Sequence, residues 1–303
     1  MALVFKPNWP VALDLIAHTA IKSIVTTTTM TLAQALAQAQ AQGLARIDAQ
    51  LLLLHVLARP DAGRAWLLAH DTDPLEPDAQ ARFAALCQRR LAGEPVAYLT
   101  GHKEFYGLPL QVDARVLDPR PDTETLVDWA LMLALPQPAP RIVDLGTGSG
   151  AIALALQHQC PQAQVLAVDA SEGALTVALA NAERLGLPVQ FAQGNWLAGL
   201  THGPFDLIVS NPPYIAADDP HLAALTHEPL QALASGADGL QDIRTIAEQA
   251  PAHLVPGGWL LLEHGHDQSA AVQQILAERG FADVQSRDDL SGIARCTGGR
   301  WPG

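Results

Sequence analysis

The segment Asn211-Pro212-Pro213-Tyr214 has the composition of a rigid polar clamp. Its two prolines lack an N–H donor and hold φ at about −65°, so the segment cannot relax into a helix. The Asn211 side-chain oxygen and the Pro212 carbonyl can then accept both N–H bonds of a substrate NH₂ group, and the Tyr214 ring can cover a planar group. An ordinary Asn-Pro turn is the alternative, but this composition favours chemistry on a planar amide or amino nitrogen.

A glycine-rich segment upstream predicts a nucleoside-binding loop. Asp144 stands shortly before the run Gly146-Thr147-Gly148-Ser149-Gly150, and an apolar helix is expected to follow. Glycines let the backbone turn tightly and come close to a ligand. Because Gly146, Gly148 and Ala151 also have the GxGxxG/A spacing of dinucleotide-binding folds, the loop alone leaves a nicotinamide or flavin enzyme open.

Residues around this loop favour S-adenosylmethionine as the cofactor. Asp144 can meet the loop and, through it or a water molecule, a cationic amino group, which a pyrophosphate does not offer. Asp169 follows the next predicted strand and can accept hydrogen bonds from both ribose hydroxyls. Asn195 offers an amide for the adenine edge and Trp196 a ring for stacking, although a core aromatic has the same pattern.

The clamp and the sulfonium cofactor together predict methyl transfer. An amide nitrogen is a poor nucleophile because its lone pair is delocalised. Two acceptors that favour a pyramidal nitrogen would localise this lone pair toward the sulfonium methyl group, which assists in-line displacement by positioning and electrostatics. The residues 211–214 are therefore the predicted catalytic residues, with Asn211 also beside the cofactor.

The elements that position these residues alternate between strands and helices after Pro121. The predicted strands are Arg141–Leu145, Gln164–Val168, Val189–Ala192, Leu207–Ser210, Trp259–Glu263 and Val284–Ser286. Such alternation is typical of an α/β doubly wound, mostly parallel sheet, in which ligands bind outside the carboxyl ends of the strands. The candidate site residues follow these strands, so we expect them to meet at one edge of the sheet.

The residues before the sheet predict three further units. Residues 1–29 show no helical pattern continuous with the next segment of the chain, and we expect a disordered tail or an upstream extension of the translated frame. Residues 30–93 are rich in Ala, Leu and Gln and predict a small bundle of roughly four helices, with Thr31 as a possible N-cap. Residues 94–120 predict a hairpin connector, with extended runs at 108–112 and 115–117. Residues 121–303 then form the methyltransferase domain.

Composition limits the partners and the compartment. The net charge of −13 over 303 residues disfavours a nucleic-acid substrate. Cys87, Cys160 and Cys296 are far apart and form no CxxC pair, so we expect a reducing compartment and no metal site. Polar residues interrupt the first 29 residues too often for a membrane span or a signal peptide, so a cytoplasmic protein without a membrane partner is expected.

At these motifs the chain resembles the release-factor glutamine N5-methyltransferases, the PrmC/HemK family, from Thr31 to about Arg295. The resemblance implies a seven-stranded class I methyltransferase sheet behind a helical substrate-recognition domain. It also implies that the substrate is the glutamine of the Gly-Gly-Gln motif in class 1 peptide chain release factors. Beyond the clamp, the matching pieces are Tyr98-Leu99-Thr100-Gly101, Glu104-Phe105-Tyr106-Gly107-Leu108, Pro119-Arg120-Pro121-Asp122-Thr123-Glu124, Leu262-Glu263-His264-Gly265 and Asp289-Leu290-Ser291-Gly292 with Arg295.

The same resemblance assigns roles to single residues. The residues 146–150 would line the cofactor, Asp169 would bind its ribose and Trp196 would lie by the adenine, while residues 211–214 would hold the glutamine. Phe105 and the segment 119–124, which contains Arg120, would close the site over the substrate.

The chain departs from the family at two positions. Asn195 stands where an aspartate is usual, which puts its contact with the adenine amino group in question. Asp118 replaces an apolar residue, and we expect it to be exposed. Arg120 and Glu124 have ordinary alternatives as a surface ion pair and a helix first-turn acid.

Three other functions share part of this pattern. An adenine N6-methyltransferase acting on DNA or RNA could hold a flipped base in the same clamp, but the chain has no Lys/Arg cluster. A ribosomal-protein glutamine methyltransferase is closer, although the segment 119–124 resembles the release-factor enzymes better. A NAD-dependent oxidoreductase would need a hydride-transfer partner, and no convincing candidate is present.

We predict that a chain starting at Met30 folds and works as well as the full chain, because residues 1–29 match nothing in the family and continue no helical pattern. Melting temperature and methyl transfer of the two chains should agree. A large loss of either on truncation would show that the segment packs against the enzyme.

Overall fold

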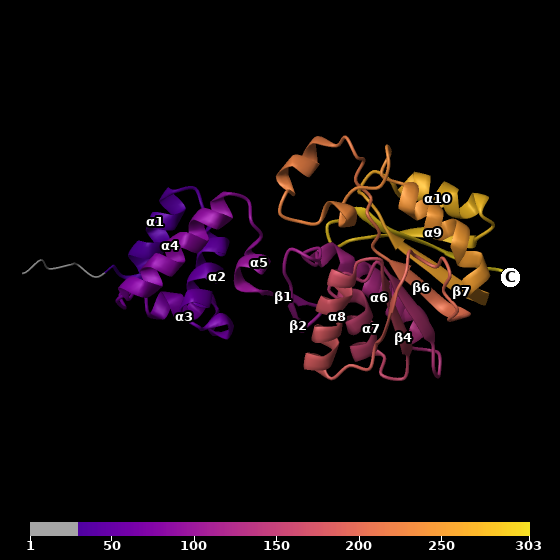
Figure 1. Ribbon diagram of the computed structural model, residues 1–303, viewed down its shortest axis with the longest axis horizontal. Helices are drawn as coiled ribbons and strands as arrows, with labels where there is room; N and C mark the ends of the chain where they lie inside the picture. The colour runs from indigo at the N-terminus through magenta and orange to yellow at the C-terminus, as the bar shows by residue number, and fades with distance from the viewer. Residues whose placement is uncertain (1–29) are drawn as a thin grey trace, which may run out of the picture.

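The computed structural model describes residues 30–303, and the predicted extension at residues 1–29 lies outside the described residues. A helical bundle occupies one end of the molecule and an α/β unit occupies the other, with a two-stranded hairpin between them (Figure 1). Each part has its own cluster of buried apolar side chains. Along the chain the bundle comes first, then the hairpin, then the sheet.

The bundle begins at the predicted cap. The Thr31 hydroxyl accepts from the Gln34 N–H at 3.3 Å, and the Gln34 side chain accepts from the Thr31 N–H at 2.9 Å, which forms a capping box. Leu52, Leu53 and Phe83 are fully or almost fully buried at its centre. Its helices are α1 (Leu32–Ala41), α2 (Arg46–Val56), η1 (Pro60–Ala62), α3 (Gly63–Ala69), α4 (Pro77–Leu91) and α5 (Val96–Thr100).

The hairpin pairs different residues from those predicted. Strand β1 (His102–Phe105) pairs antiparallel with β2 (Leu108–Gln111), while the predicted run 115–117 is not a strand. Tyr106 and Gly107, with φ of 51° and 79°, form the tight two-residue connection that the twist of a hairpin favours. Asp113 accepts from the Arg115 N–H at 3.0 Å and turns the chain instead.

The sheet confirms the predicted mostly parallel, doubly wound architecture. Its strands are β3 (Arg141–Leu145), β4 (Gln164–Asp169), β5 (Gln190–Gln193), β6 (Phe205–Ser210), β7 (Leu254–Glu263), β8 (Ala282–Asp288) and β9 (Ala294–Arg300), in the order β5-β4-β3-β6-β7-β9-β8. Strands β3 to β7 are parallel, and β9 runs antiparallel to both of its neighbours. Only the family resemblance indicated a strand at β9, because its two adjacent glycines and two arginines give a weak strand signal.

Helices cover both faces of the sheet (Figure 1). Helices α6 (Glu124–Ala134), α7 (Ala151–Gln159) and α8 (Glu172–Leu185) pack on one face, and α9 (Gln241–Gln249) and α10 (Ser269–Glu278) pack on the other. The central strands are therefore apolar on both sides. Short 3-10 turns complete the chain at η2 (Pro121–Thr123), η3 (Pro220–Ala224), η4 (Leu230–Ala232) and η5 (Ala250–His253). Within residues 30–303, no helix has the length and apolarity to cross a membrane.

We predict that Gly298→Ala destabilises the fold by about 1 to 3 kcal/mol through overpacking. A Cβ atom at this position of β9 would lie 2.8 Å from Trp129 Cη2 and 3.0 Å from the Leu260 carbonyl oxygen. Chemical denaturation should show this loss. The control Gly173→Ala, whose Cβ would have no neighbour closer than 3.4 Å, should leave stability nearly unchanged, and an equal loss in both variants would contradict overpacking as the cause.

Candidate active site

A cavity of about 340 Å³ lies at the carboxyl ends of the parallel strands, and this volume is within the usual range for a small-molecule site. Strands β4 and β5 are added on one side of β3, and β6 and β7 are added on the other side. A ligand-binding crevice is expected at this point, between β3 and β6, in this type of sheet. The predicted residues that line the cavity are Gly146, Gly148, Asp169, Asn195, Trp196, Asn211 and Pro213. The structure thus brings the loop, the ribose acid and part of the clamp to one space.

The glycine loop is tied to the end of the neighbouring strand. The N–H groups of Gly146 and Thr147 donate to the Val168 carbonyl at 2.8 and 3.0 Å. Gly146 has a φ of 70°, and a Cβ atom there would lie 3.1 Å from the Trp196 ring. The position therefore favours glycine on two grounds, backbone conformation and close approach. Thr147 and Ser149 are loop residues with buried side chains, and they do not line the cavity. Gly150 does not line it either.

Asp169 is held with its carboxylate on the cavity wall. One oxygen accepts from the Gly148 N–H and the other from the Ser171 N–H, both at 2.9 Å. A carboxylate oxygen can accept more than one hydrogen bond, so both oxygens keep acceptor capacity for a ligand hydroxyl. This geometry fits the predicted ribose contact.

Trp196 is fixed by a residue that the sequence did not single out. Its Nε1–H donates to Asp242 Oδ1 at 3.1 Å, from the first turn of α9. The Trp196 backbone has a φ of 56°, an unusual conformation for a bulky residue and one that is often found at functional sites. The indole is thereby held on the cavity wall beside Asn195, where its predicted contact with adenine remains a prediction.

Asp144 supports the loop from below rather than lining the cavity. Its carboxylate is fully buried and accepts from the Thr147 hydroxyl at 2.6 Å and the Ala153 N–H at 3.2 Å. Burial raises the pKa of Asp144 to about 7. The predicted contact with the loop is present, and a further link to the ligand remains a prediction.

The clamp residues follow β6 and are anchored from both sides. Asn211 Nδ2 donates to the Thr123 hydroxyl at 3.2 Å, and Asn211 and Pro213 line the cavity. The carbonyl of Tyr214 accepts from Gln268 Nε2 at 3.0 Å, and burial raises the pKa of the Tyr214 phenol to about 12. Pro212 and Tyr214 do not line this cavity, so their roles against the substrate remain predictions.

Glu263 ends β7 close to the clamp, and the sequence indicated no role for it. Its side chain is almost completely buried. Burial raises its pKa to about 7, although hydrogen bonding from Thr123 and Asn211 favours its charged form. Together with Thr123 it connects the clamp to the start of α6.

Phe105 and Arg120 lie on a second, larger cavity. This cavity of about 890 Å³ is bounded by the helical bundle, the hairpin and the residues around Glu228. Phe105 is only 1% exposed and packs in the core beneath the hairpin. Neither residue lines the smaller cavity, so their predicted role in closing the methyl-transfer site is not visible in this structure.

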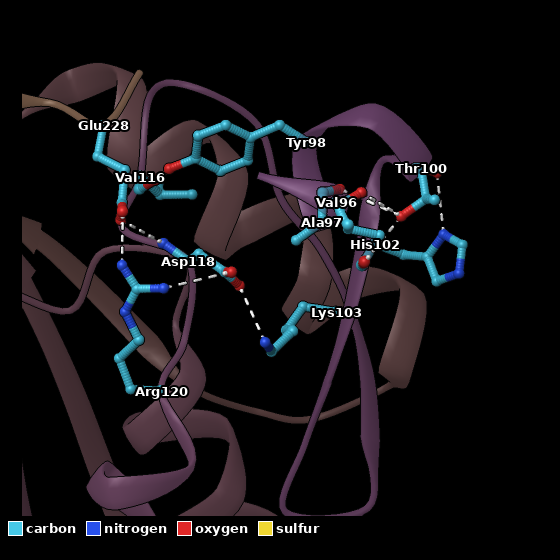
Figure 2. A network of polar contacts seen from close by, with 10 residues as sticks. All are labelled: Val96, Ala97, Tyr98, Thr100, His102, Lys103, Val116, Asp118, Arg120 and Glu228. Atoms are coloured by element: carbon cyan, nitrogen blue, oxygen red, sulfur yellow. Dashed lines mark hydrogen bonds and ion pairs between the residues drawn. The ribbon is translucent and has the colours of Figure 1, made fainter. Parts of the chain in front are cut away.

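The expectation that Asp118 is exposed is wrong. Figure 2 shows its carboxylate between Lys103 and Arg120, at 3.4 and 3.5 Å, and its side chain is only 10% exposed. Arg120 also binds the buried carboxylate of Glu228 at 2.5 Å. The two cations compensate the charge of the Asp118 carboxylate, so Arg120 belongs to a partly buried network rather than to an isolated surface pair.

Comparison with known proteins identifies the family. The model of the methyltransferase small domain matches residues 127–285, and that of the PrmC N-terminal domain matches residues 30–101. The chain is 51% identical over 260 residues to the release factor glutamine methyltransferase of Bordetella pertussis, covering 85% of this chain and 95% of that relative. The chain belongs to the release factor glutamine methyltransferase family.

Further comparisons agree with this family. The release factor glutamine methyltransferase of Salmonella typhimurium is 46% identical over 259 residues, which cover 84% of this chain and 92% of the relative. A methyltransferase crystal structure from Pyrococcus furiosus aligns with a TM-score of 0.51 at 21% identity, over 71% of this chain and 97% of that one. The latter supports the class I methyltransferase fold of the sheet. Among residues 30–303, no three His, Cys, Asp or Glu side chains are grouped to hold a metal ion.

We predict that Asp169→Ala weakens binding of S-adenosylmethionine by about 2 to 3 kcal/mol, because hydrogen bonds to a charged acceptor disappear. Calorimetry on the variant and on Asp71→Ala, an exposed position in the bundle, would measure the difference. Unchanged affinity in Asp169→Ala would remove this residue from the cofactor site.

Proposed function

We propose that this chain transfers a methyl group from S-adenosylmethionine to the side-chain amide nitrogen, N5, of the glutamine in the Gly-Gly-Gln motif of class 1 peptide chain release factors. The observation that carries the proposal is the position of Asn211. Its NH₂ is bound by Thr123, while the residue lines the same cavity as Asp169 and the glycine loop. An acceptor oxygen and a nucleoside site therefore face one space.

The cavity has the features that S-adenosylmethionine requires. Gly146 leaves room where a Cβ atom would approach the Trp196 ring, and Asp169 presents a carboxylate fixed by two backbone N–H groups. Gly146, Gly148, Asp169, Asn195 and Trp196 would hold the cofactor. Bound there, the cofactor would supply an electrophilic methyl group on its sulfonium.

The protein's part in the reaction is to orient the amide nitrogen. Asn211 Oδ1 and the Pro212 carbonyl would each accept one N–H of the glutamine side chain. This holds the nitrogen in place and favours a localised lone pair, and no protein group needs to act as a nucleophile. Methyl transfer would leave S-adenosylhomocysteine and a nitrogen that carries a positive charge. This nitrogen would become neutral again by losing one of its protons to water.

The large cavity supports a role for the N-terminal unit in substrate recognition. We propose that residues 30–93 form a recognition domain, residues 94–120 a connector, and residues 121–303 the methyltransferase domain. The cavity of about 890 Å³ is lined by residues from the bundle, including Leu51 and Arg90, and by Arg120 and Glu124. A segment of a release factor placed there would lie next to the connector that leads to the clamp. We place the reaction in the cytoplasm, where these protein substrates act.

We predict that Asn211→Ala leaves cofactor affinity nearly unchanged but lowers methyl transfer by about a hundredfold or more, the usual scale for losing one preorganised polar contact to a transition state. Asn211→Asp should also lose activity, because it keeps size and acceptor but adds a charge and removes the anchoring donor. Calorimetry and transfer of labelled methyl groups to purified release factor would measure both effects.

Two substrates serve as controls in the same assay. A release factor with Gln→Ala in its Gly-Gly-Gln motif, and plasmid DNA, should accept no label from the wild-type enzyme. If both Asn211 variants bind cofactor normally and methylate at the wild-type rate, the assignment of the clamp is wrong.

A further inference from the structure

Two buried residues stand behind Asn211 and outside the cavity. Thr123 ends η2 and is 4% exposed, and Glu263 ends β7 and is 2% exposed. The sheet brings Glu263 to Asn211, because Ser210 of β6 pairs with Leu262 of β7. Thr123 is placed beside Asn211 from η2, where it accepts the bond from Asn211 Nδ2. Both are almost completely buried and neither lines the cavity, so we assign neither a contact with the reacting atoms.

The proposed reaction depends on which way the Asn211 amide points. An asparagine amide has nearly the same shape after a half-turn, which exchanges its oxygen and its NH₂ group. Only the oxygen can accept an N–H of the substrate, so a reversed amide would present donors to donors. The bond from Asn211 Nδ2 to the Thr123 hydroxyl, at 3.2 Å, belongs to the productive direction.

The Thr123 hydroxyl can hold that direction only if its own proton points elsewhere. A hydroxyl donates one hydrogen bond. The Thr123 hydroxyl can direct it to the Glu263 carboxylate, whose charged form is favoured by hydrogen bonding from both Thr123 and Asn211. When Thr123 donates to Glu263, its oxygen lone pairs remain for Asn211. When Glu263 is protonated, the carboxyl group can donate to Thr123 instead, and the Thr123 proton is then free to point toward Asn211.

We infer that Thr123 and Glu263 are positioning residues that set the direction of the Asn211 amide: the Glu263 carboxylate accepts the Thr123 proton, the Thr123 oxygen accepts from Asn211, and the Asn211 oxygen is left for the substrate. The inference rests on the proposed role of Asn211. Glu263 Oε2 has no hydrogen-bond partner among residues 30–303. An ionised group in that environment is costly unless it is hydrogen-bonded or paired, so the bonds that Glu263 accepts favour its charged form.

The surroundings of Glu263 set the pH at which this arrangement is lost. Burial has the largest effect and raises the pKa of Glu263 to about 7. Asp122 of η2 raises this pKa further and Arg295 of β9 lowers it. The pKa of Tyr214 and of Cys296 is raised well above neutrality, and that of the adjacent His264 is lowered by burial. Protonation of Glu263 on going below about pH 7 should therefore reduce turnover.

The first test compares two substitutions of one hydroxyl. Thr123→Val removes the hydrogen-bonding group at constant size, and Thr123→Ser keeps it. We expect Thr123→Val to lower kcat by about ten- to a hundredfold, the usual range for losing the support of a functional side chain, with cofactor affinity unchanged. Thr123→Ser should stay within about threefold of the wild type, and Thr176→Val, at an exposed position of α8, should have no effect. Wild-type kcat in Thr123→Val, or an equal loss in Thr123→Ser, would overturn the inference.

The second test uses Glu263→Gln and holds even if Thr123→Val does not fold. The assay is run at saturating cofactor, to separate the effect from titration of Asp144 under the loop. Under this condition, wild-type kcat should decrease as the pH is lowered through about 7. Glu263→Gln keeps an acceptor oxygen but cannot titrate, so it should lack this acidic limb, with an undiminished melting temperature. An acidic limb of unchanged position in Glu263→Gln would exclude Glu263. If the wild-type enzyme does not methylate release factor at all, the proposed function is wrong. If the wild-type enzyme does so and Thr123→Val keeps the same kcat, only the inference about the positioning residues is wrong.

Discussion

The site depends on the pairing of three parallel strands at their carboxyl ends. Leu145, the last residue of β3, pairs with Val168 on one side and with Ser210 on the other. The Ser210 hydroxyl also donates to the Leu145 carbonyl at 2.7 Å, which fixes the ends of β3 and β6 together. Since the glycine loop follows β3 and the clamp follows β6, this register sets the distance between the cofactor and the accepting nitrogen. A slip of one residue would turn each strand's side chains to the opposite face and misplace both halves.

Two buried carboxylates lie behind functional loops at the carboxyl ends of the parallel strands. Asp144 lies under the glycine loop and Glu263 behind the clamp, and burial raises the pKa of each to about 7. Neither lines the cavity. Both bind groups that in turn shape it, through Thr147 in one case and Thr123 in the other. Buried carboxylates are costly, so their presence next to two functional loops indicates that orientation is being maintained there.

Most of the fold could be predicted from the sequence, because each strand and helix is indicated by residues that are close together in the chain. Apolar strands followed by glycine or polar residues predicted the parallel sheet and the residues at its edge, including Asp169 and Asn211. The burial of Asp118 could not be predicted, since its surroundings depend on contacts distant in the chain, such as Arg120 with Glu228. The partners in the hairpin could not be predicted because the turn needs a left-handed conformation at Tyr106, which is unusual for a bulky residue. For the same reason the sequence did not indicate the Asp242 bond to Trp196 or the position of Thr123 behind Asn211.

The central claim is that this edge of the sheet methylates a glutamine amide nitrogen. Tandem mass spectrometry of a class 1 release factor after incubation with the enzyme and S-adenosylmethionine locates the product directly. We expect one added methyl group on the side-chain amide of the glutamine in the Gly-Gly-Gln motif. A methyl group on any other residue, or an unmodified release factor under conditions in which the enzyme methylates adenine in DNA, would contradict this claim.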